Sequence, residues 1–514
     1  MKLKFIAAAC VAVCSTGAFA AATPVTCVPT TLAGLVNTCA PEVTFYVGGA
    51  SAQAGAMSAI LESATGGGIF DTTKTRGKIS LTATSVAGLN GGSDVSKTNT
   101  IGFIGIGASD AGATIAGKRV LVIYNKANGS NAGVNQLLTG KGGNLEEVTL
   151  KTAAAKELVK GIAGVCTVGT ESAAGAPSVF GAASCASAVA FSTAWGADAQ
   201  KKMHMALSDV RPNEAAPGVV KSWKPASFPS QTTGMQGFGV MVNPALYTAL
   251  ITKEIAAGRL AASCSSSETV SGATYTITAA CVPNLSRAEY ASIVTGKITT
   301  AVQLLGTTGD TKTINLARRH SSSGTQAASN IYFANQQGYN AKLTAVDGGD
   351  AYADVKVAGT YGSLVVTEGS ATGDVITAVS GNTTNYALGV VSIENTYSNT
   401  VASSKLKGAL FVKLEGVSPI HKADGTIDAK ARAGMLNGYP FAFQMQAIKS
   451  TTLADPYLTI YTKIVTALTD PSKDLAGIAY IGSSDATKNT VYTRFTDPAS
   501  GVLSGGNYLP MLRN

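Results

Sequence analysis

The chain has 514 residues, of which 45% are hydrophobic and 13% charged, and its formal net charge is +9. A chain of this length is too long for one hydrophobic core and indicates two domains or a two-lobed body. The basic residues are scattered along the sequence, so it contains no basic stripe of the kind that binds nucleic acid, and no nucleic-acid partner is expected.

Residues 1–20 have the order of a secretory signal peptide: Lys2 and Lys4, then an apolar run, then a small-residue end at Ala20. Residues 21–42 form a leader behind it. No later run of about 18 apolar residues occurs, so no stable membrane span is expected once the signal is removed. The chain is therefore expected to be a bacterial periplasmic or secreted protein.

Six cysteines lie outside the signal and form three close pairs along the sequence. An even number of cysteines in an exported chain indicates disulfides. Among the possible connectivities we expect Cys27–Cys39, Cys166–Cys185 and Cys264–Cys281. With three histidines and no C-x-x-C motif, the sequence gives little support to a metal site, and no cofactor is expected.

Strand-like and helix-like segments alternate along the chain. The strands are expected at residues 43–49, 101–112, 119–125, 385–395 and 439–448, and the helices at 51–63, 285–296, 372–380 and 458–470. Residues 237–250 are expected to form a strand followed by a helix, and residues 313–338 a strand, a polar turn and a helix. Ser286 and Glu289 form an S-x-x-E capping box at the start of one of these helices. This alternation predicts an α/β architecture with largely parallel sheets.

Two regions interrupt the alternation, at about residues 128–235 and 258–284. The first is rich in Ala, Gly and Ser, and the second is rich in Ser and Thr. Each contains one of the expected disulfides. Both regions are therefore interpreted as surface insertions stapled by a disulfide.

Three expected strands run into turns of small and hydroxyl-bearing residues, at residues 49–53, 107–110 and 323–325. A helix amino terminus offers free N–H groups and a partial positive charge, and small residues let an anion approach closely. Arg319, four positions before Ser323, adds a guanidinium suited to phosphate or carboxylate. One such turn is an ordinary helix cap, whereas three turns and an arginine indicate an anion site.

These turns carry a resemblance to a known family. Gly107-Ala108-Ser109-Asp110-Ala111 is similar to the G-A-S-D-A turn of the phosphate-binding proteins of bacterial ATP-binding-cassette (ABC) importers, which have the type 2 periplasmic binding protein fold. Arg319 and Ser323-Gly324-Thr325 match their R-x-x-x-S-G-T turn, and residues 49–53 loosely match their G-A-T-F-P turn. The chain thus resembles an exported solute-binding protein.

The resemblance implies a fold of two α/β lobes with disulfide-stapled insertions and an oxyanion, most of all hydrogen phosphate, in the cleft between the lobes. Residues 43–120 and 400–514 would form the first lobe and residues 121–399 the second. The partners implied are phosphate or a similar oxyanion and an ABC permease.

The resemblance also implies which residues bind the anion: Ala50, Ser51, Ala52, Ser109, Asp110, Arg319, Ser323, Gly324 and Thr325. Asp110 would be the selectivity element, because a carboxylate accepts the proton of hydrogen phosphate and repels sulfate. Two positions depart from the family pattern. Ala52-Gln53 replaces an aromatic residue and a proline, and Ser321 stands where an acidic partner for Arg319 is usual.

Other functions remain open. A secreted or cell-surface structural or adhesive protein that reuses the phosphate-binding fold is the main alternative, favoured by the insertions, the expected disulfides and the Thr/Gly-rich composition. A serine hydrolase would use His320 with a neighbouring serine, but adjacent residues seldom face each other and no G-x-S-x-G elbow occurs. A phosphatase would need a metal cluster that the sequence does not show. The chain is therefore not expected to be an enzyme.

Overall fold

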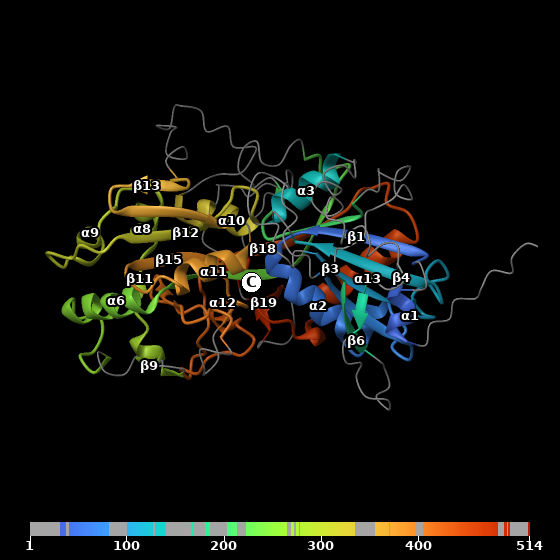
Figure 1. Cartoon of the computed structure of the whole chain (residues 1–514), viewed down its shortest axis with the longest axis horizontal. Helices are drawn as coiled ribbons and strands as arrows, with labels where there is room; N and C mark the ends of the chain where they lie inside the picture. The colour runs from blue at the N-terminus through green and yellow to red at the C-terminus, as the bar shows by residue number, and fades with distance from the viewer. Residues whose placement is uncertain are drawn as a thin grey trace, which may run out of the picture.

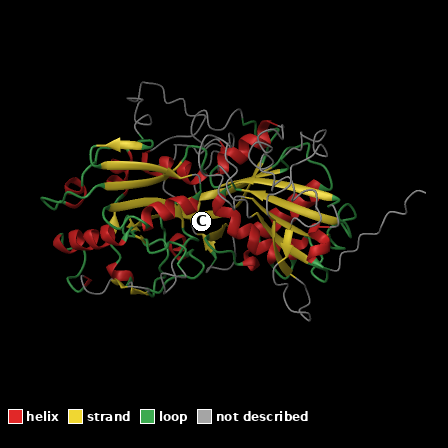
Figure 2. Cartoon of the chain, in the orientation of Figure 1, coloured by secondary structure: helices red, strands yellow, loops and turns green. Residues whose placement is uncertain are grey.

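In the computed structural model, the structure describes residues 31–37, 41–81, 100–126, 129–139, 166–168, 180–185, 203–212, 223–264, 269–271, 274–276, 278–334, 355–369, 371–396, 404–481, 488–490, 492–493 and 512–513. The predicted signal peptide, most of the leader, Cys27 and Cys39 lie outside these residues and stay predictions. Figures 1 and 2 show strands in two groups, side by side, with helices packed against them.

One continuous path of hydrogen-bonded strands runs through both groups. In spatial order its strands are β13 (Gly359–Tyr361), β14 (Leu364–Gly369), β12 (Ile314–Arg319), β15 (Tyr386–Ser392), β8 (Ser230–Val242), β18 (Ala442–Ile448), β7 (Met205–Ser208), β1 (Val43–Gly49), β4 (Arg119–Asn125), β3 (Thr100–Ile106), β2 (Arg76–Leu81), β6 (Phe180–Cys185) and β5 (Cys166–Val168). Beside this path, β16 (Leu410–Phe411) and β19 (Ile478–Ile481) pair with β8, and β20 (Asn489–Thr490) pairs with β19.

The long strand β8 belongs to both groups. Its first part, from Ser230 to Gly237, pairs with β18, and its second part, from Phe238 to Val242, pairs with β15. We call the β18-to-β5 side the first lobe and the β15-to-β13 side the second lobe. In Figure 1 the first lobe, with β1, β3 and β4, lies on the right, and the second lobe, with β12 and β15, lies on the left.

The parallel strands of both lobes point their carboxyl ends toward the junction between the lobes. In the first lobe β1, β4 and β7 are parallel, and in the second lobe β12, β14 and β15 are parallel. β7 is antiparallel to β18, β18 to β8, and β8 to β15, so β7 and β15 run in opposite directions. Ligands of open α/β sheets bind at the carboxyl ends of parallel strands. The junction is therefore the place to look for a site.

Helices cover the faces of the sheet. They are α1 (Leu32–Asn37), α2 (Ala54–Glu62), α3 (Gly129–Thr139), α6 (Pro244–Ala256), α8 (Arg287–Val294), α9 (Ala301–Leu305), α10 (Gly324–Ala334), α11 (Thr372–Ser380), α12 (Ala433–Leu436) and α13 (Tyr457–Thr469), with 3-10 turns η1 (Ser51–Gln53), η2 (Gly66–Gly68), η6 (Ala279–Cys281) and η9 (Pro471–Lys473). The expected capping box is confirmed: the Ser286 hydroxyl accepts from the N–H of Glu289, whose carboxylate accepts from the N–H of Ser286. Small two-stranded pairs complete the described elements: β9 (Thr269–Ser271) with β10 (Thr274–Thr276), β11 (Asn284–Leu285) with β17 (Lys413–Leu414), and β21 (Tyr492–Thr493) with β22 (Leu512–Arg513).

The first-lobe sheet is buried on both faces. Side chains alternate along a strand, so Phe45 and Val47 of β1 join a core with α2 and α13, whereas Tyr46 joins a core with α1 and α3. The second lobe has one larger core, to which both strands and helices contribute. No helix among the described residues has the length and apolar composition needed to cross a membrane.

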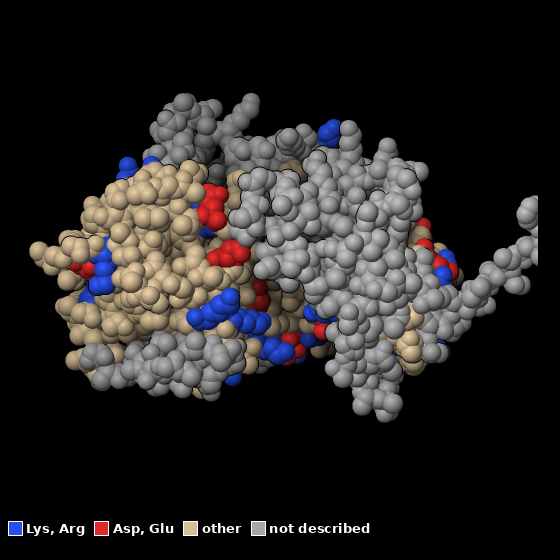
Figure 3. Space-filling model, in the orientation of Figure 1, with Lys and Arg blue, Asp and Glu red and all other residues tan. Residues whose placement is uncertain are grey.

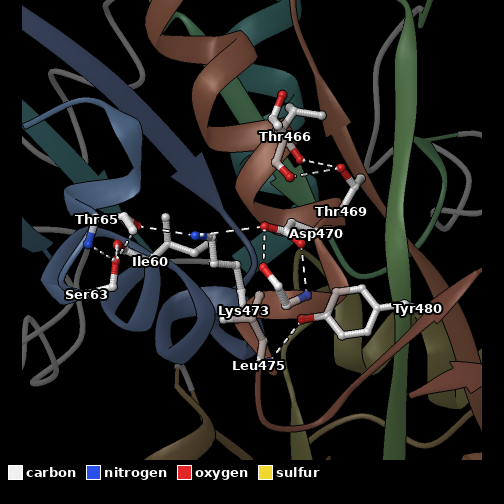
Figure 4. Close-up of polar contacts among 11 residues, drawn as sticks. Ile60, Ser63, Thr65, Thr466, Thr469, Asp470, Lys473, Leu475 and Tyr480 are labelled. Atoms are coloured by element: carbon white, nitrogen blue, oxygen red, sulfur yellow. Dashed lines mark hydrogen bonds and ion pairs between the residues drawn. The ribbon is translucent and has the colours of Figure 1, made fainter. Parts of the chain in front are cut away.

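A polar contact fixes α13 against the end of α2 (Figure 4). Lys473 Nζ, in the turn after α13, donates to Thr65 Oγ1 at 3.3 Å and lies 3.8 Å from the Asp470 carboxylate. The Ser63 hydroxyl donates to the Ile60 carbonyl at 2.6 Å, which closes the end of α2. The buried packing of Met57 and Ile60 of α2 with Ile460 of α13 holds the two helices together, and these surface contacts add to it.

The expected α/β fold is confirmed, and most expected elements appear near their predicted bounds. The first-lobe sheet includes β4, β5, β6, β7 and the first part of β8, and so extends past the lobe boundary expected at residue 121. Cys264 and Cys281 form the expected disulfide. Cys166 and Cys185 are register partners on the paired strands β5 and β6, and their bond stays a prediction.

Candidate functional site

Arg319, the last residue of β12, lies at the junction with 1% of its surface exposed. Its Nη1 donates to Ser51 Oγ at 3.1 Å and to Thr372 Oγ1 at 3.1 Å. The two hydroxyl oxygens are 3.2 Å apart. Ser51 follows β1 in the first lobe and Thr372 opens α11 in the second, so this guanidinium links the two lobes.

The turn after Arg319 packs on the start of α3. The N–H of Asn131 donates to the Ser322 carbonyl at 3.0 Å. A Cβ on Gly324 would lie 2.1 Å from Ser130 Oγ and 2.9 Å from Asp209 Oδ2. The amino terminus of α10 is therefore in direct contact with α3 and with the end of β7, and only glycine fits at its first position.

Asp209, directly after β7, is the buried carboxyl of this place, with 1% of its surface exposed. Burial raises the pKa of Asp209 to about 6, although Ser130, Arg319, Gln53 and Thr325 act to lower it. Within the described part of the chain, its Oδ1 is buried without a hydrogen-bond partner. A buried acceptor thus remains for a ligand to satisfy.

These residues form what we call the junction cluster: Ser51, Gln53, Ser130, Asp209, Arg319, Gly324, Thr325 and Thr372. Burial lowers the pKa of Arg319 to about 10, and the carboxylates of Asp209 and Asp374 act in the opposite direction. Arg319 therefore stays charged at neutral pH. Ser321, which replaces the expected acidic residue, is exposed, so Asp209 and Asp374 supply negative charge from other segments.

Charged side chains also collect near the junction at the surface. In Figure 3, acidic and basic side chains lie along the inner edge of the second lobe.

Among the described residues, no group of three or more His, Cys, Asp or Glu side chains is arranged to hold a metal.

The turn after β1 contributes differently from what its sequence implied. Ala50 and Ala52 are buried, at 0% and 3% exposure. The N–H of Ala50 donates to the Leu207 carbonyl at 2.8 Å, and its carbonyl accepts from the Tyr124 hydroxyl. Both backbone polar groups of Ala50 are thus already hydrogen-bonded within the protein. The hydroxyl of Ser51 is the group of this turn that reaches the junction.

The structure does not bring Ser109 and Asp110 to the cluster. Both are exposed, and the Asp110 carbonyl accepts from Lys463 Nζ at 3.5 Å, beside α13. β3 is antiparallel to β4, which is parallel to β1, so residues after β3 emerge at the edge where β1 begins. β1 has seven residues and spans roughly 20 Å, so the turn after β3 and the turn after β1 lie at opposite edges of the sheet.

Asp209 is the carboxyl that sequence reasoning missed. It lies in MALSDV, a short apolar strand followed by Ser-Asp, within a region interpreted as a surface insertion. The signal was present, because an apolar strand that ends in a small polar residue and an aspartate has the same form as residues 103–110. Thr372 was expected only as the first residue of a helix, and Ser130 lies in the region interpreted as a surface insertion, so neither was assigned to the site.

His320 and Ser322 do face each other, contrary to expectation. The Ser322 hydroxyl lies 2.6 Å from His320 Nδ1, and the Ser322 N–H donates to the same nitrogen at 3.3 Å. The N–H of Ser323 also donates to the His320 carbonyl at 3.0 Å. These bonds form a closed local turn that sets the start of α10.

No protein-family model and no curated protein matches the chain. Solved structures of phosphate-binding proteins do resemble it. An ABC-type phosphate transport receptor from Vibrio cholerae is 12% identical, with 82% of this chain and 93% of that chain covered and a TM-score of 0.34. A high affinity periplasmic phosphate-binding protein bound with phosphate is 12% identical, with 84% and 87% covered and a TM-score of 0.37.

A phosphate binding protein from Stenotrophomonas maltophilia is 16% identical, with 48% of this chain and 64% of that chain covered and a TM-score of 0.25. The solved structures that resemble the chain thus include proteins named for phosphate binding or phosphate transport. At such TM-scores the likeness identifies neither a ligand nor a site, which rest on the contacts described above.

Proposed function

We propose that the junction cluster binds a tetrahedral oxyanion, preferably hydrogen phosphate. The observation that carries this proposal is the guanidinium of Arg319, buried at the meeting point of two lobes and bonded to a hydroxyl from each. The amino terminus of α10 adds N–H groups at Gly324 and Thr325. A buried cation surrounded by hydroxyl and N–H donors suits an anion, since each donor becomes stronger when its acceptor is charged.

In this proposal Asp209 takes the selectivity role that the family resemblance implies for Asp110. Its buried Oδ1 is an acceptor without a partner among the described groups. Hydrogen phosphate carries a proton that this oxygen can accept, whereas sulfate has none at neutral pH. With a pKa of about 6, Asp209 is mostly ionised at pH 7 and above, so sulfate would meet both repulsion and an unsatisfied acceptor.

In this proposal no covalent bond is made or broken. The anion joins Ser51 of the first lobe to Arg319 of the second, and the lobes move about the strand β8 that they share. The chain would act as an exported solute-binding protein that delivers the anion to an ABC permease. Export and the permease are proposed from the signal-like residues 1–20 and from the family that the sequence resembles.

The test is calorimetric titration with phosphate and with sulfate. We expect wild type to bind phosphate in preference to sulfate, and Asp209→Asn to weaken phosphate binding by roughly 10- to 100-fold, the range for a hydrogen bond to a charged group. Asp110→Asn is the matched control and should leave both affinities unchanged. A wild-type protein that binds neither anion at millimolar concentration would refute the proposal and favour the surface-protein alternative.

A further inference from the structure

Thr372 is a residue of the junction cluster that lies outside the three turns on which the family resemblance rests. It is the first residue of α11, and its hydroxyl lies within hydrogen-bonding distance of both Arg319 Nη1 and Ser51 Oγ. Thr372 and Ser51 are only partly buried, whereas Arg319 is fully buried beneath them. The two hydroxyls therefore lie on the accessible side of the guanidinium.

Arg319 Nη1 and the hydroxyls of Ser51 and Thr372 have one more proton to donate than acceptors among themselves. Arg319 Nη1 has two protons, and it donates one to each hydroxyl. One hydroxyl can donate its own proton to the other oxygen, since the two oxygens are 3.2 Å apart. The second hydroxyl proton then has no acceptor among the three groups. The pair thus presents one donor that is fixed in place by a buried cation.

The position of Thr372 is set by tight packing of α11. Val375, Ile376 and Val379 are buried against the second-lobe strands. The N–H of Ala371 donates to Asp374 Oδ2 at 2.8 Å, and a Cβ on Gly369 would lie 2.7 Å from the Asp374 Cβ. Gly369 is also the register partner of Arg319 on the neighbouring strand. The helix start is therefore held beside the arginine with little freedom to move.

We propose that Thr372 is a third contact residue for the oxyanion, whose hydroxyl, shared with Ser51 across the junction, donates to one of the anion's oxygens. This inference rests on the proposed function and adds α11 as a wall of the site beside α10 and the turn after β1. Because Ser51 belongs to the first lobe and Thr372 to the second, the pair exists only while the lobes are in contact. Anion binding through Thr372 would thus require that the two lobes are closed on each other.

The experiment compares phosphate titrations of wild type, Thr372→Val, Thr372→Ser and Thr377→Val. Valine keeps the shape and removes the hydroxyl, so we expect phosphate binding about tenfold weaker, as for one lost hydrogen bond. Serine restores the hydroxyl and should bind within about twofold of wild type. Thr377 lies on the same helix, its hydroxyl accepts from the exposed Lys407 at 3.2 Å, and its valine variant is the control expected to bind as wild type does.

The outcomes separate this inference from the function on which it rests. Wild type that binds phosphate, with Thr372→Val unchanged, overturns the inference alone. Weak binding by both the valine and the serine variants would also overturn it, because a purely structural role does not depend on the hydroxyl. Wild type that binds neither phosphate nor sulfate overturns the proposed function and this inference together. Thermal unfolding of each variant checks that it is folded.

Discussion

Gly324→Ala is the substitution whose effect the structure defines most sharply. The added Cβ would lie 2.1 Å from Ser130 Oγ, 2.7 Å from Ser130 Cβ and 2.9 Å from Asp209 Oδ2. Ordinary contacts are near 3.5 Å, so α10 and α3 would have to separate by about 1 Å. Ser130 cannot simply turn away, because its hydroxyl accepts from the N–H of Asp209 at 3.1 Å. The change thus disturbs three segments of the site together.

The expected cost is that of overpacking a filled core, roughly 1–3 kcal/mol in the free energy of unfolding. Gly373→Ala is a matched control, since Gly373 is also in the first turn of a helix, and a Cβ there meets nothing within 4 Å. Alanine at such a position should stabilise by about 0.5–1 kcal/mol through its higher helix propensity. The two variants are therefore expected to change stability in opposite directions.

The assay is urea unfolding of both variants and wild type, followed by phosphate titration. We expect Gly324→Ala to unfold at lower urea and to bind phosphate at least tenfold more weakly, because Ser130 and Asp209 are displaced. If Gly324→Ala were as stable as Gly373→Ala, α10 would not pack on α3 as described. Gly324 and Thr325 would then no longer belong to the junction cluster.

Two further predictions concern stability. Burial raises the pKa of Glu394 from 4.5 to about 7, so the stability that its protonated form contributes is present below about pH 4.5 and is lost as the pH rises toward 7. In urea unfolding, Glu394→Gln should therefore gain stability relative to wild type between about pH 5 and pH 7.5. A difference that stays constant over this range would show that the carboxyl does not titrate there. The Cys264–Cys281 disulfide spans 17 residues, and replacing both cysteines by alanine should lower the free energy of unfolding by about 2–4 kcal/mol. This difference should disappear when wild type and variant are compared in reductant. If the difference persists in reductant, the loss comes from packing and not from the disulfide.

The sequence was sufficient for most helices and strands because their signals are local. The capping box at Ser286 and Glu289 predicted the start of α8, and the apolar run that ends in Gly49 predicted β1. Arg319 and Ser51, 268 residues apart, were both expected at the site, and the structure brings them within 3.1 Å.

The site could not be completed from sequence because strand direction is not a local property. Asp110 and Asp209 each follow an apolar strand, and each is preceded directly by a serine. Only the pairing of β3 against β4, and of β7 beside β1, decides which aspartate reaches the junction. Strand direction and register therefore place Asp110 away from Arg319, and they place Asp209 near it.

The position of β18 bears on the order in which the chain can fold during its synthesis. β18 lies between β7 and β8 in the sheet, yet its residues follow those of β8 by about 200 positions. Until Ile448 has been made, β7 and β8 each present an open edge of unpaired N–H and C=O groups. A nascent or truncated chain that ends before Ala442 would therefore be prone to aggregate, and the first lobe must wait for the last quarter of the chain to complete its sheet.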